Sequence, residues 1–337
     1  MVSRWPRPLP PHPIRAVLRI VSDISGAPGG LRGSVTSCRD FDAATVASAI
    51  AATIAATIAE YPIDARGELL DAGNVWSFLL QVNPPLAIGD SCMLDLGFFK
   101  QNGYVNLGQV FTVEELNRFI DLYDRDKSES GCFWHPISNH GHQTLNCDPL
   151  ISSPQIDGLI RHPALIEPIE TIFDGPSWLG EVCLRHVESR DGNPEEIWHR
   201  DRPHATDRPY RCGYLQMMLY LTDVHDGTHC FSISPEPCDG PILETEEQLA
   251  QRGKVHLHGP AGTVVLFNLS VLHAATVRIT PHERKTVQIY YGHRGGPVLS
   301  DCTMIPARLW RDHPDPDVRG FYGMMTGRTQ QYAEAFG

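Results

Sequence analysis

Between residues 181 and 291 the sequence is a succession of short apolar segments, most of them rich in Val, Ile, Leu, Phe and Tyr. Turn-forming residues such as Gly, Pro, Asp and Asn separate these segments. Strands of this length and spacing are typical of an antiparallel β-sandwich or barrel. The predicted strands are 181–187, 214–221, 230–234, 255–257, 262–268, 271–279 and 285–291.

Two helical segments precede these strands, so the expected fold is mainly β with flanking helices. Residues 112–123 begin with Thr112 and carry Glu115 three positions later, which is the pattern of a helix capping box. The second segment, 156–172, has apolar residues at helical spacing and a new start near Pro163.

A His-x-Asp motif is formed by His199 and Asp201. In an extended chain, residues two apart point to the same face, so the imidazole and the carboxylate lie side by side. The motif alone is weak, because a surface pair beside Arg200 and Arg202 would give the same letters. Its place after the polar segment 189–196 and before the next strand favours a position at the mouth of the barrel.

We expect a third ligand from His273, which lies at the end of the apolar, β-branched run 262–273. Two histidines and one carboxylate on one face leave three coordination positions open, an arrangement associated with Fe(II) oxygenases. The candidate metal ligands and catalytic residues are therefore His199, Asp201 and His273.

Arg284 opens the next predicted strand, 285–291. If a turn is centred near Pro281, then Ile279 faces Arg284 on the side of the sheet that carries His273. A guanidinium inside a barrel is costly unless it meets an anion. A small dicarboxylate could pair one carboxylate with Arg284 while its 2-oxo acid end chelates the metal. The alternative is a solvated arginine in a hairpin turn.

In combination these motifs resemble the phytanoyl-CoA dioxygenase-like family of Fe(II)/2-oxoglutarate-dependent oxygenases. The resemblance covers about residues 94–294. The similar segments are the opening 98–107, with a strand at 104–107, the helix 112–123, the His-x-Asp segment 197–201, the central strand 217–224 followed by Gly227 and Ser234, and 262–273 with Arg284 eleven residues beyond.

The resemblance implies a double-stranded β-helix, that is, a jelly roll or cupin-like barrel. It also implies that His199, Asp201 and His273 hold Fe(II), that Arg284 anchors the cosubstrate 2-oxoglutarate, and that O₂ is consumed. The implied reaction hydroxylates an unactivated C–H bond of a small organic substrate, with succinate and CO₂ as co-products. Asp201 favours hydroxylation over halogenation, because halogenating relatives carry a small residue in its place.

One position departs from the family pattern. Family members often carry a hydroxyl residue two positions after the distal histidine, where this chain has Ala275. The adjacent Thr276 could take over that contact, or cosubstrate binding could rely more on Arg284. The matching central-strand position near Leu219 offers only an apolar wall to the cosubstrate.

Substrate contacts are expected at the mouth of the barrel. The polar segment 127–150, predicted to be a long loop, contributes Trp134 and His135. Arg202 and His204 follow directly after the His-x-Asp motif. Each of these residues could also be ordinary loop surface, and His204 could instead support a metal ligand from behind. No motif identifies the substrate.

Two other functions stay open at this stage. A nucleic-acid demethylase of the same chemistry would fit the spacing of Arg278 and Arg284, but the net charge of −12 disfavours a phosphate backbone as partner. A cupin-like protein that binds a metal or small molecule without oxidising it would not need all four candidate residues. Desaturation, epoxidation and cyclisation driven by 2-oxoglutarate are also compatible with the sequence.

Cysteine usage and hydropathy predict a cytoplasmic protein. The nine cysteines have no C-x-x-C spacing and an odd count, which favours reduced thiols over a zinc ribbon or disulfide framework. No uninterrupted apolar run has the length of a membrane span. Arg19 interrupts the apolar segment near the basic N-terminus, so this segment is a poor match to a secretory signal peptide. Oligomeric state is left open.

Three regions are expected along the chain. Residues 1–92 form a biased extension rich in Pro, Gly and Ala, with a weakly amphipathic helix predicted at 43–60. The extension is expected to be partly disordered or, if Met93 is the natural start, not translated. Residues 93–300 form the oxygenase domain, and 301–337 form a tail that packs on it.

Overall fold

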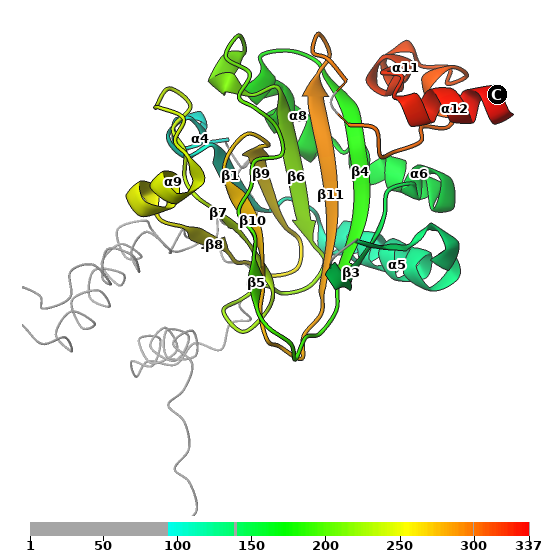
Figure 1. Cartoon of the computed structure of the whole chain (residues 1–337). Helices are drawn as coiled ribbons and strands as arrows, with labels where there is room; N and C mark the ends of the chain where they lie inside the picture. Colours follow the sequence, from blue (N-terminus) through cyan, green and yellow to red (C-terminus); the bar gives the residue numbers. More distant parts are fainter. Residues whose placement is uncertain (1–93, 138–139, 299, 337) are drawn as a thin grey trace, which may run out of the picture. The chain divides into compact units, whose positions relative to one another are not determined.

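Two antiparallel β-sheets face each other in the computed structural model, which describes residues 94–137, 140–298 and 300–336 (Figure 1). The large sheet has the strand order β1-β9-β6-β11-β4-β3-β2, and the small sheet has the order β5-β10-β7-β8. This arrangement is the expected double-stranded β-helix with flanking helices. The predicted extension 1–92, with its helix at 43–60, lies outside the described residues.

Each of the seven strands predicted between residues 181 and 291 is present, with shifted ends, and so is the strand expected at 104–107. The strands of the large sheet are β1 (Tyr104–Gln109), β2 (His135–Ile137), β3 (His140–Asn146), β4 (Ser177–Val187), β6 (Tyr214–Tyr220), β9 (Thr263–Asn268) and β11 (Arg284–His293). Those of the small sheet are β5 (Glu195–Glu196), β7 (Cys230–Ile233), β8 (Val255–Leu257) and β10 (His273–Val277).

Helices flank the sheets. In α5 (Val113–Glu129), Thr112 and Glu115 form both hydrogen bonds of the predicted capping box. The predicted helical stretch 156–172 is divided into α7 (Asp157–Ile160) and α8 (Pro163–Phe173), because proline fits the first turn of a new helix. The other helices are α4 (Leu96–Asn102), α6 (Pro149–Ser152), α9 (Thr245–Arg252), α10 (Ala307–Trp310), α11 (Pro316–Tyr322) and α12 (Gly327–Phe336).

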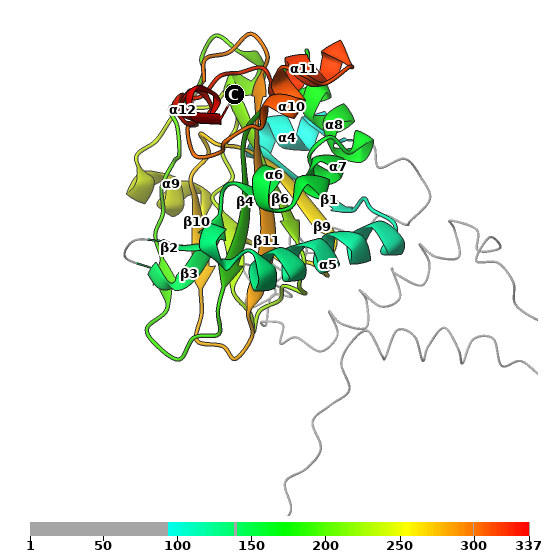
Figure 2. The same cartoon turned by 90° about the vertical axis from the view of Figure 1, so that its right-hand side faces the viewer.

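The two faces of the large sheet have different partners, because side chains alternate along each strand. On β6, Met217 and Leu219 belong to the apolar cluster that packs against the helices, whereas Met218 and Tyr220 lie between the sheets. Figure 2 shows α5, α6, α7 and α8 over the helix-covered face. The hydroxyl of Tyr220 donates to the carbonyl of Leu257 on β8 at 2.9 Å, and this bond ties the large sheet to the small one.

The prediction of one long loop at 127–150 is wrong. The helix α5 continues to Glu129, and β2 and β3 add two strands to the large sheet beyond β4. The strand β3 reads HGHQTLN and lacks the apolar alternation that marks a strand in a sequence. Its backbone pairs with β4, for example Gln143 opposite Val187, so pairing rather than patterning defines it.

The predicted hairpin between 271–279 and 285–291 is also wrong. The strand β10 pairs with β5 and β7 in the small sheet, whereas β11 pairs with β4 and β6 in the large sheet. The residues between them carry the chain from one sheet to the other. Ile279 is therefore 63% exposed and does not face Arg284, whose strand partner is Val187 of β4.

The predicted tail is helical and packs on the domain. The side chain of Thr303 accepts a hydrogen bond from the backbone N–H of Val182 on β4 at 3.0 Å. The hydroxyl of Tyr322 donates to Asp157 of α7 at 2.5 Å. Among the described residues, no helix combines the length and apolarity that crossing a membrane requires. The described cysteines are free thiols: 132, 147, 183, 212, 230, 238 and 302.

Gly103 provides a test of how α4 and β1 are packed. Its φ is 72°, and an added Cβ would collide with the side chain of Val271 and lie 3.0 Å from the carbonyl of Glu236. We expect Gly103→Ala to lower the free energy of unfolding by about 2–5 kcal/mol, because left-handed strain and overpacking add. Gly108→Ala is the matched control: φ is 67° but the added Cβ meets nothing within 4 Å. Urea unfolding compares the two, and equal losses would contradict the packing argument.

Candidate metal centre

The backbone brings the two predicted site histidines together. The N–H of His199 donates to the carbonyl of His273 at 2.9 Å, and the N–H of His273 donates to the carbonyl of His199 at 3.0 Å. The N–H of Asp201 donates to the carbonyl of Leu269 at 3.1 Å. The His-x-Asp segment is thus held as a short antiparallel bridge against the start of β10.

The side chains of His199, Asp201 and His273 converge, with one possible ligand atom from each lying within 4.8 Å of the others. His199 Nε2 is 3.3 Å from Asp201 Oδ1, and His273 Nε2 is 3.7 Å from Asp201 Oδ2. The Nδ1 atoms donate to the carbonyls of Ile197 at 3.0 Å and Val271 at 2.8 Å. These bonds fix both rings and leave each Nε2 available to a metal.

The electrostatics of the cluster suit a metal ligand set. Burial alone raises the pKa of Asp201, but hydrogen bonds from His199 and Tyr290 and the nearby His273 outweigh it and lower the pKa to about 2. Burial lowers the pKa of His273 to about 4. At neutral pH the centre therefore offers an ionised carboxylate and a neutral buried imidazole, the forms that bind a cation.

A polar wall on the large sheet faces the centre. Alternate residues of β11 point between the sheets, and we call Arg284, Thr286, Gln288 and Tyr290 the inner wall. The hydroxyl of Tyr290 donates to Asp201 Oδ2 at 2.9 Å, so the far end of the inner wall touches the metal centre directly.

Arg284 lies at the other end of the inner wall and is 1% exposed. Its Nε and Nη1 atoms are buried and have no hydrogen-bond partner among the described residues. Tyr220 is the nearby phenol on β6, and burial raises its pKa well above the usual value for tyrosine, so it is neutral. An unpaired buried guanidinium costs several kcal/mol, of order 5, which makes it an evident place for an anion.

A buried carboxylate braces the centre from behind. Glu236, 2% exposed, accepts from Arg200 at 3.0 Å and contacts His204 Nε2 at 2.9 Å. It also accepts from the backbone N–H of Leu272 at 3.4 Å. Arg200 stands between two candidate ligands and Leu272 precedes the third, so Glu236 joins the two segments that carry them.

Of the residues predicted to contact the cosubstrate, one points between the sheets and two do not. Ala275 shares a face of β10 with His273 and points between the sheets. Thr276 lies on the opposite face, where its hydroxyl bonds Ser232 at 2.5 Å and Glu196 at 2.8 Å, so the expectation that it replaces a cosubstrate contact is wrong. Leu219 packs on the helix-covered face of β6, and the expectation of a cosubstrate wall there is also wrong.

Of the four residues predicted to contact the substrate, two have buried side chains and two are exposed. Trp134 is buried against α5, and its indole N–H donates to Asp126 at 2.8 Å, which is a packing role. The side chain of His204 is buried and contacts Glu236. His135 and Arg202 are exposed, and Arg202 follows Asp201 directly.

Sequence reasoning missed Tyr290 and Glu236. Tyr290 lies six residues after Arg284, so the period-two rule applied to one strand would have placed both on the same face. Glu236 had no such signal, because a loop glutamate becomes a buried brace only through contacts far away in sequence.

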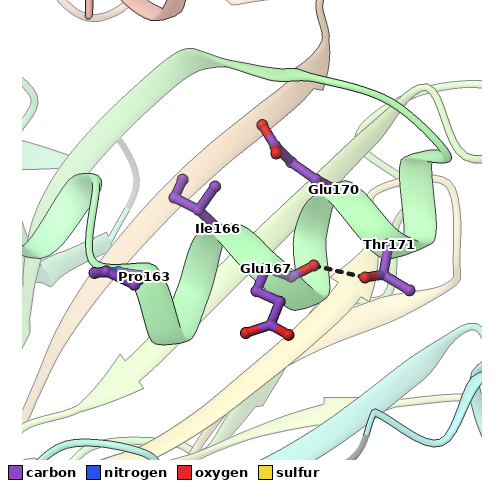
Figure 3. Close-up of a pocket in the computed structure, with 5 residues that line it drawn as sticks. All are labelled: Pro163, Ile166, Glu167, Glu170 and Thr171. Atoms are coloured by element: carbon purple, nitrogen blue, oxygen red, sulfur yellow. Dashed lines mark hydrogen bonds between the residues drawn. The ribbon is translucent and has the colours of Figure 1, made fainter. Parts of the chain in front are cut away.

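A separate surface hollow lies along α8 and is unrelated to the centre (Figure 3). One helix supplies all of its lining, and the hydroxyl of Thr171 donates to the carbonyl of Glu167 within it. The lining residues are Pro163, Ile166, Glu167, Glu170 and Thr171.

Comparison with known proteins adds a family and a fold. The model of the family described as phytanoyl-CoA dioxygenase (PhyH) matches residues 99–286, more than half of the chain. A search of curated proteins finds no match.

Two solved structures illustrate the fold. EctD from S. alaskensis, solved with 2-oxoglutarate and 5-hydroxyectoine, has a TM-score of 0.51 and 17% identity, with 64% of this chain and 79% of that chain covered. SnoN, described as a non-heme alpha ketoglutarate dependent epimerase from nogalamycin biosynthesis, has a TM-score of 0.51 and 17% identity, with 59% and 79% covered. At this identity the likeness is one of fold.

Metal binding tests the centre directly. We expect Mn(II), used as a redox-stable probe, to bind wild-type protein saturably and Asp201→Ala to lose this binding, because a charged ligand is removed. Asp226→Ala is the matched control, since Asp226 also lies beside a histidine, 3.6 Å from His258, but is 96% exposed. Isothermal titration calorimetry measures both variants. Retained binding in Asp201→Ala, or loss in Asp226→Ala, would place the metal elsewhere.

The contacts of Glu236 with the ligand segments can be tested without removing a metal ligand. We expect Glu236→Gln to weaken Mn(II) binding about 10–100-fold, as is usual for residues that orient ligands from behind. The variant keeps the side-chain shape but loses the charge that holds Arg200 and His204. The electron paramagnetic resonance spectrum of bound Mn(II) should broaden as the ligand geometry loosens. An unchanged affinity and spectrum would limit Glu236 to a role in folding.

Proposed function

The chain belongs to the phytanoyl-CoA dioxygenase family, and from this premise we propose that it is an Fe(II)- and 2-oxoglutarate-dependent dioxygenase that hydroxylates a small organic molecule. In the proposed reaction, one atom of O₂ converts a substrate C–H bond into C–OH. The other atom enters succinate as 2-oxoglutarate loses CO₂.

The donor set fits Fe(II). His199 and His273 offer imidazole nitrogens and Asp201 offers a carboxylate oxygen, which is the set found in non-haem iron oxygenases with open coordination positions. Iron bound there supplies the oxidising power, while the protein supplies ligand geometry and positioning. The hydrogen bond from Tyr290 orients the carboxylate of Asp201 and helps to keep it ionised.

The observation that carries the proposal is the unpaired guanidinium of Arg284 on the wall that faces the ligand set. A dicarboxylate such as 2-oxoglutarate provides an anion for Arg284 at one end of this wall and a chelating group for the metal at the other. One carboxylate pairs with Arg284 in the planar geometry that arginine favours, and the 2-oxo acid end reaches the metal.

Exposure distinguishes the cosubstrate side from the substrate side. The side chain of Arg284 is fully buried, so the cosubstrate lies inside, between the sheets. The side chain of His199 is 50% exposed, so the substrate is expected to approach past the His-x-Asp segment. Exposed Arg202, next to Asp201, stays a candidate for substrate contact on that side.

The other functions considered from the sequence have less support. Arg278, needed for the demethylase spacing, donates to the carbonyl of Thr228 at 2.6 Å and is used by the fold. A metal-binding protein without oxidation chemistry leaves the unpaired Arg284 unexplained.

Cosubstrate binding is tested by adding 2-oxoglutarate to the Fe(II)-loaded protein without oxygen and following the metal-to-ligand charge-transfer band. We expect the band in wild-type protein and its loss in Arg284→Met. The same substitution should leave the ligand-free protein as stable as wild type or more stable, because it removes an unpaired buried charge.

Arg278→Met is the matched control and should keep the band, since Arg278 bonds only the backbone in its surroundings. Succinate formation in air then measures turnover. A folded, iron-loaded wild type with no band would refute the oxygenase proposal and favour a binding protein. A large loss of stability in Arg284→Met would mean that Arg284 serves folding.

A further inference from the structure

A second arginine lies between the sheets, and the proposed reaction does not use it. Arg185 of β4 is opposite Thr286 of the inner wall and opposite Leu145 of β3. Directly opposed residues share a face, so Arg185 points to the same side as Arg284 and Tyr290.

Arg185 has no anionic partner within the described ranges. Its Nε atom is buried without a hydrogen bond, and the neighbouring polar side chain is the thiol of Cys183. By contrast, Arg190, five residues later, pairs with Glu195 at 2.5 Å. The chain thus neutralises the arginine near the surface and leaves the arginine between the sheets unpaired.

Arg185 lies beside the inner wall, whose far end contacts the metal centre. Its strand partner Thr286 stands between Arg284 and Tyr290 on β11. The hydroxyl of Tyr290 donates to Asp201 Oδ2 at 2.9 Å. Arg185 is partly exposed whereas Arg284 is not, so a molecule that enters from solvent can reach Arg185 more easily than Arg284.

The sum of the charges around the metal centre indicates which kind of group Arg185 binds. Fe(II) bound to Asp201 and two neutral histidines carries one net positive charge, and Arg284 carries another. The two carboxylates of 2-oxoglutarate balance both of these charges. The charge of Arg185 is left without a counterion, and its buried Nε atom is an unpaired donor between the sheets, which is costly.

We propose that Arg185 binds an anionic group of the molecule that is oxidised, so that the substrates of this enzyme are small organic acids. This inference rests on the proposed function and adds a substrate class to it. A carboxylate held by Arg185 would fix the orientation of the substrate beside the metal, with its C–H bond presented from the side of His199.

Acetate is the probe, and acetamide is its neutral counterpart. We expect acetate, added to the anaerobic complex with Fe(II) and 2-oxoglutarate, to change the charge-transfer band saturably, and acetamide to have no effect. Arg185→Gln should weaken the acetate effect about tenfold or more, because a charge-assisted hydrogen bond is lost. Its affinity for 2-oxoglutarate should stay within about twofold, since Arg284 remains. Arg190→Gln is the matched control and should respond as wild type does.

The outcomes separate the alternatives. A normal band with no acetate effect in wild type overturns the proposal. An acetate effect that persists in Arg185→Gln means direct binding to the metal and also overturns it. Weakened 2-oxoglutarate binding in Arg185→Gln would make Arg185 a second cosubstrate anchor. Absence of the band in wild type is a failure of the oxygenase proposal itself, which Mn(II) binding and succinate formation identify independently.

Discussion

The pair of backbone hydrogen bonds between His199 and His273 is the constraint on which the rest of the site depends. These residues are 74 positions apart in sequence, and the two hydrogen bonds hold their backbones side by side. The bridge extends the small sheet by one more pair and delivers all three side chains to one face. Everything else around the centre, including Tyr290 and Glu236, adjusts a geometry that the backbone has already fixed.

The space between the sheets departs from ordinary core chemistry near this bridge. Aromatic and aliphatic residues such as Phe231 and Phe267 fill part of it, yet Arg284 and Arg185 leave buried donors unpaired in the same layer. Such groups lower the stability of the empty protein. Among the described residues, the cluster on the helix-covered face of the same sheet is apolar and includes no unpaired arginine. Stability and ligand binding are thus assigned to opposite faces of the same strands.

Much of this could be predicted from the sequence, because a short apolar segment between turn-forming residues is a local signal. It located β4, β6, β7 and β9, whereas the candidate ligands came from the His-x-Asp motif and from the histidine at the end of the run 262–273. It failed for β3, whose polar residues are a strand only through pairing with β4. The family resemblance placed Thr276 and Leu219 beside the cosubstrate, but both side chains lie on the opposite faces of their strands, because a shift of one residue turns a side chain to the other face. The sequence between β10 and β11 does not indicate that the chain changes sheet there. A hairpin turn and a connection between two sheets use the same types of residue.

That change of sheet has a consequence for the size of the cosubstrate. His273 and Arg284 are eleven residues apart in sequence but belong to facing sheets, and Tyr220 ties those sheets together through Leu257. The gap between metal and guanidinium is therefore set by the spacing of two rigid layers rather than by a flexible loop. In the proposed binding mode a rigid gap measures length: we expect it to discriminate among 2-oxo diacids by the number of methylene groups, because a shorter or longer one cannot satisfy both ends together.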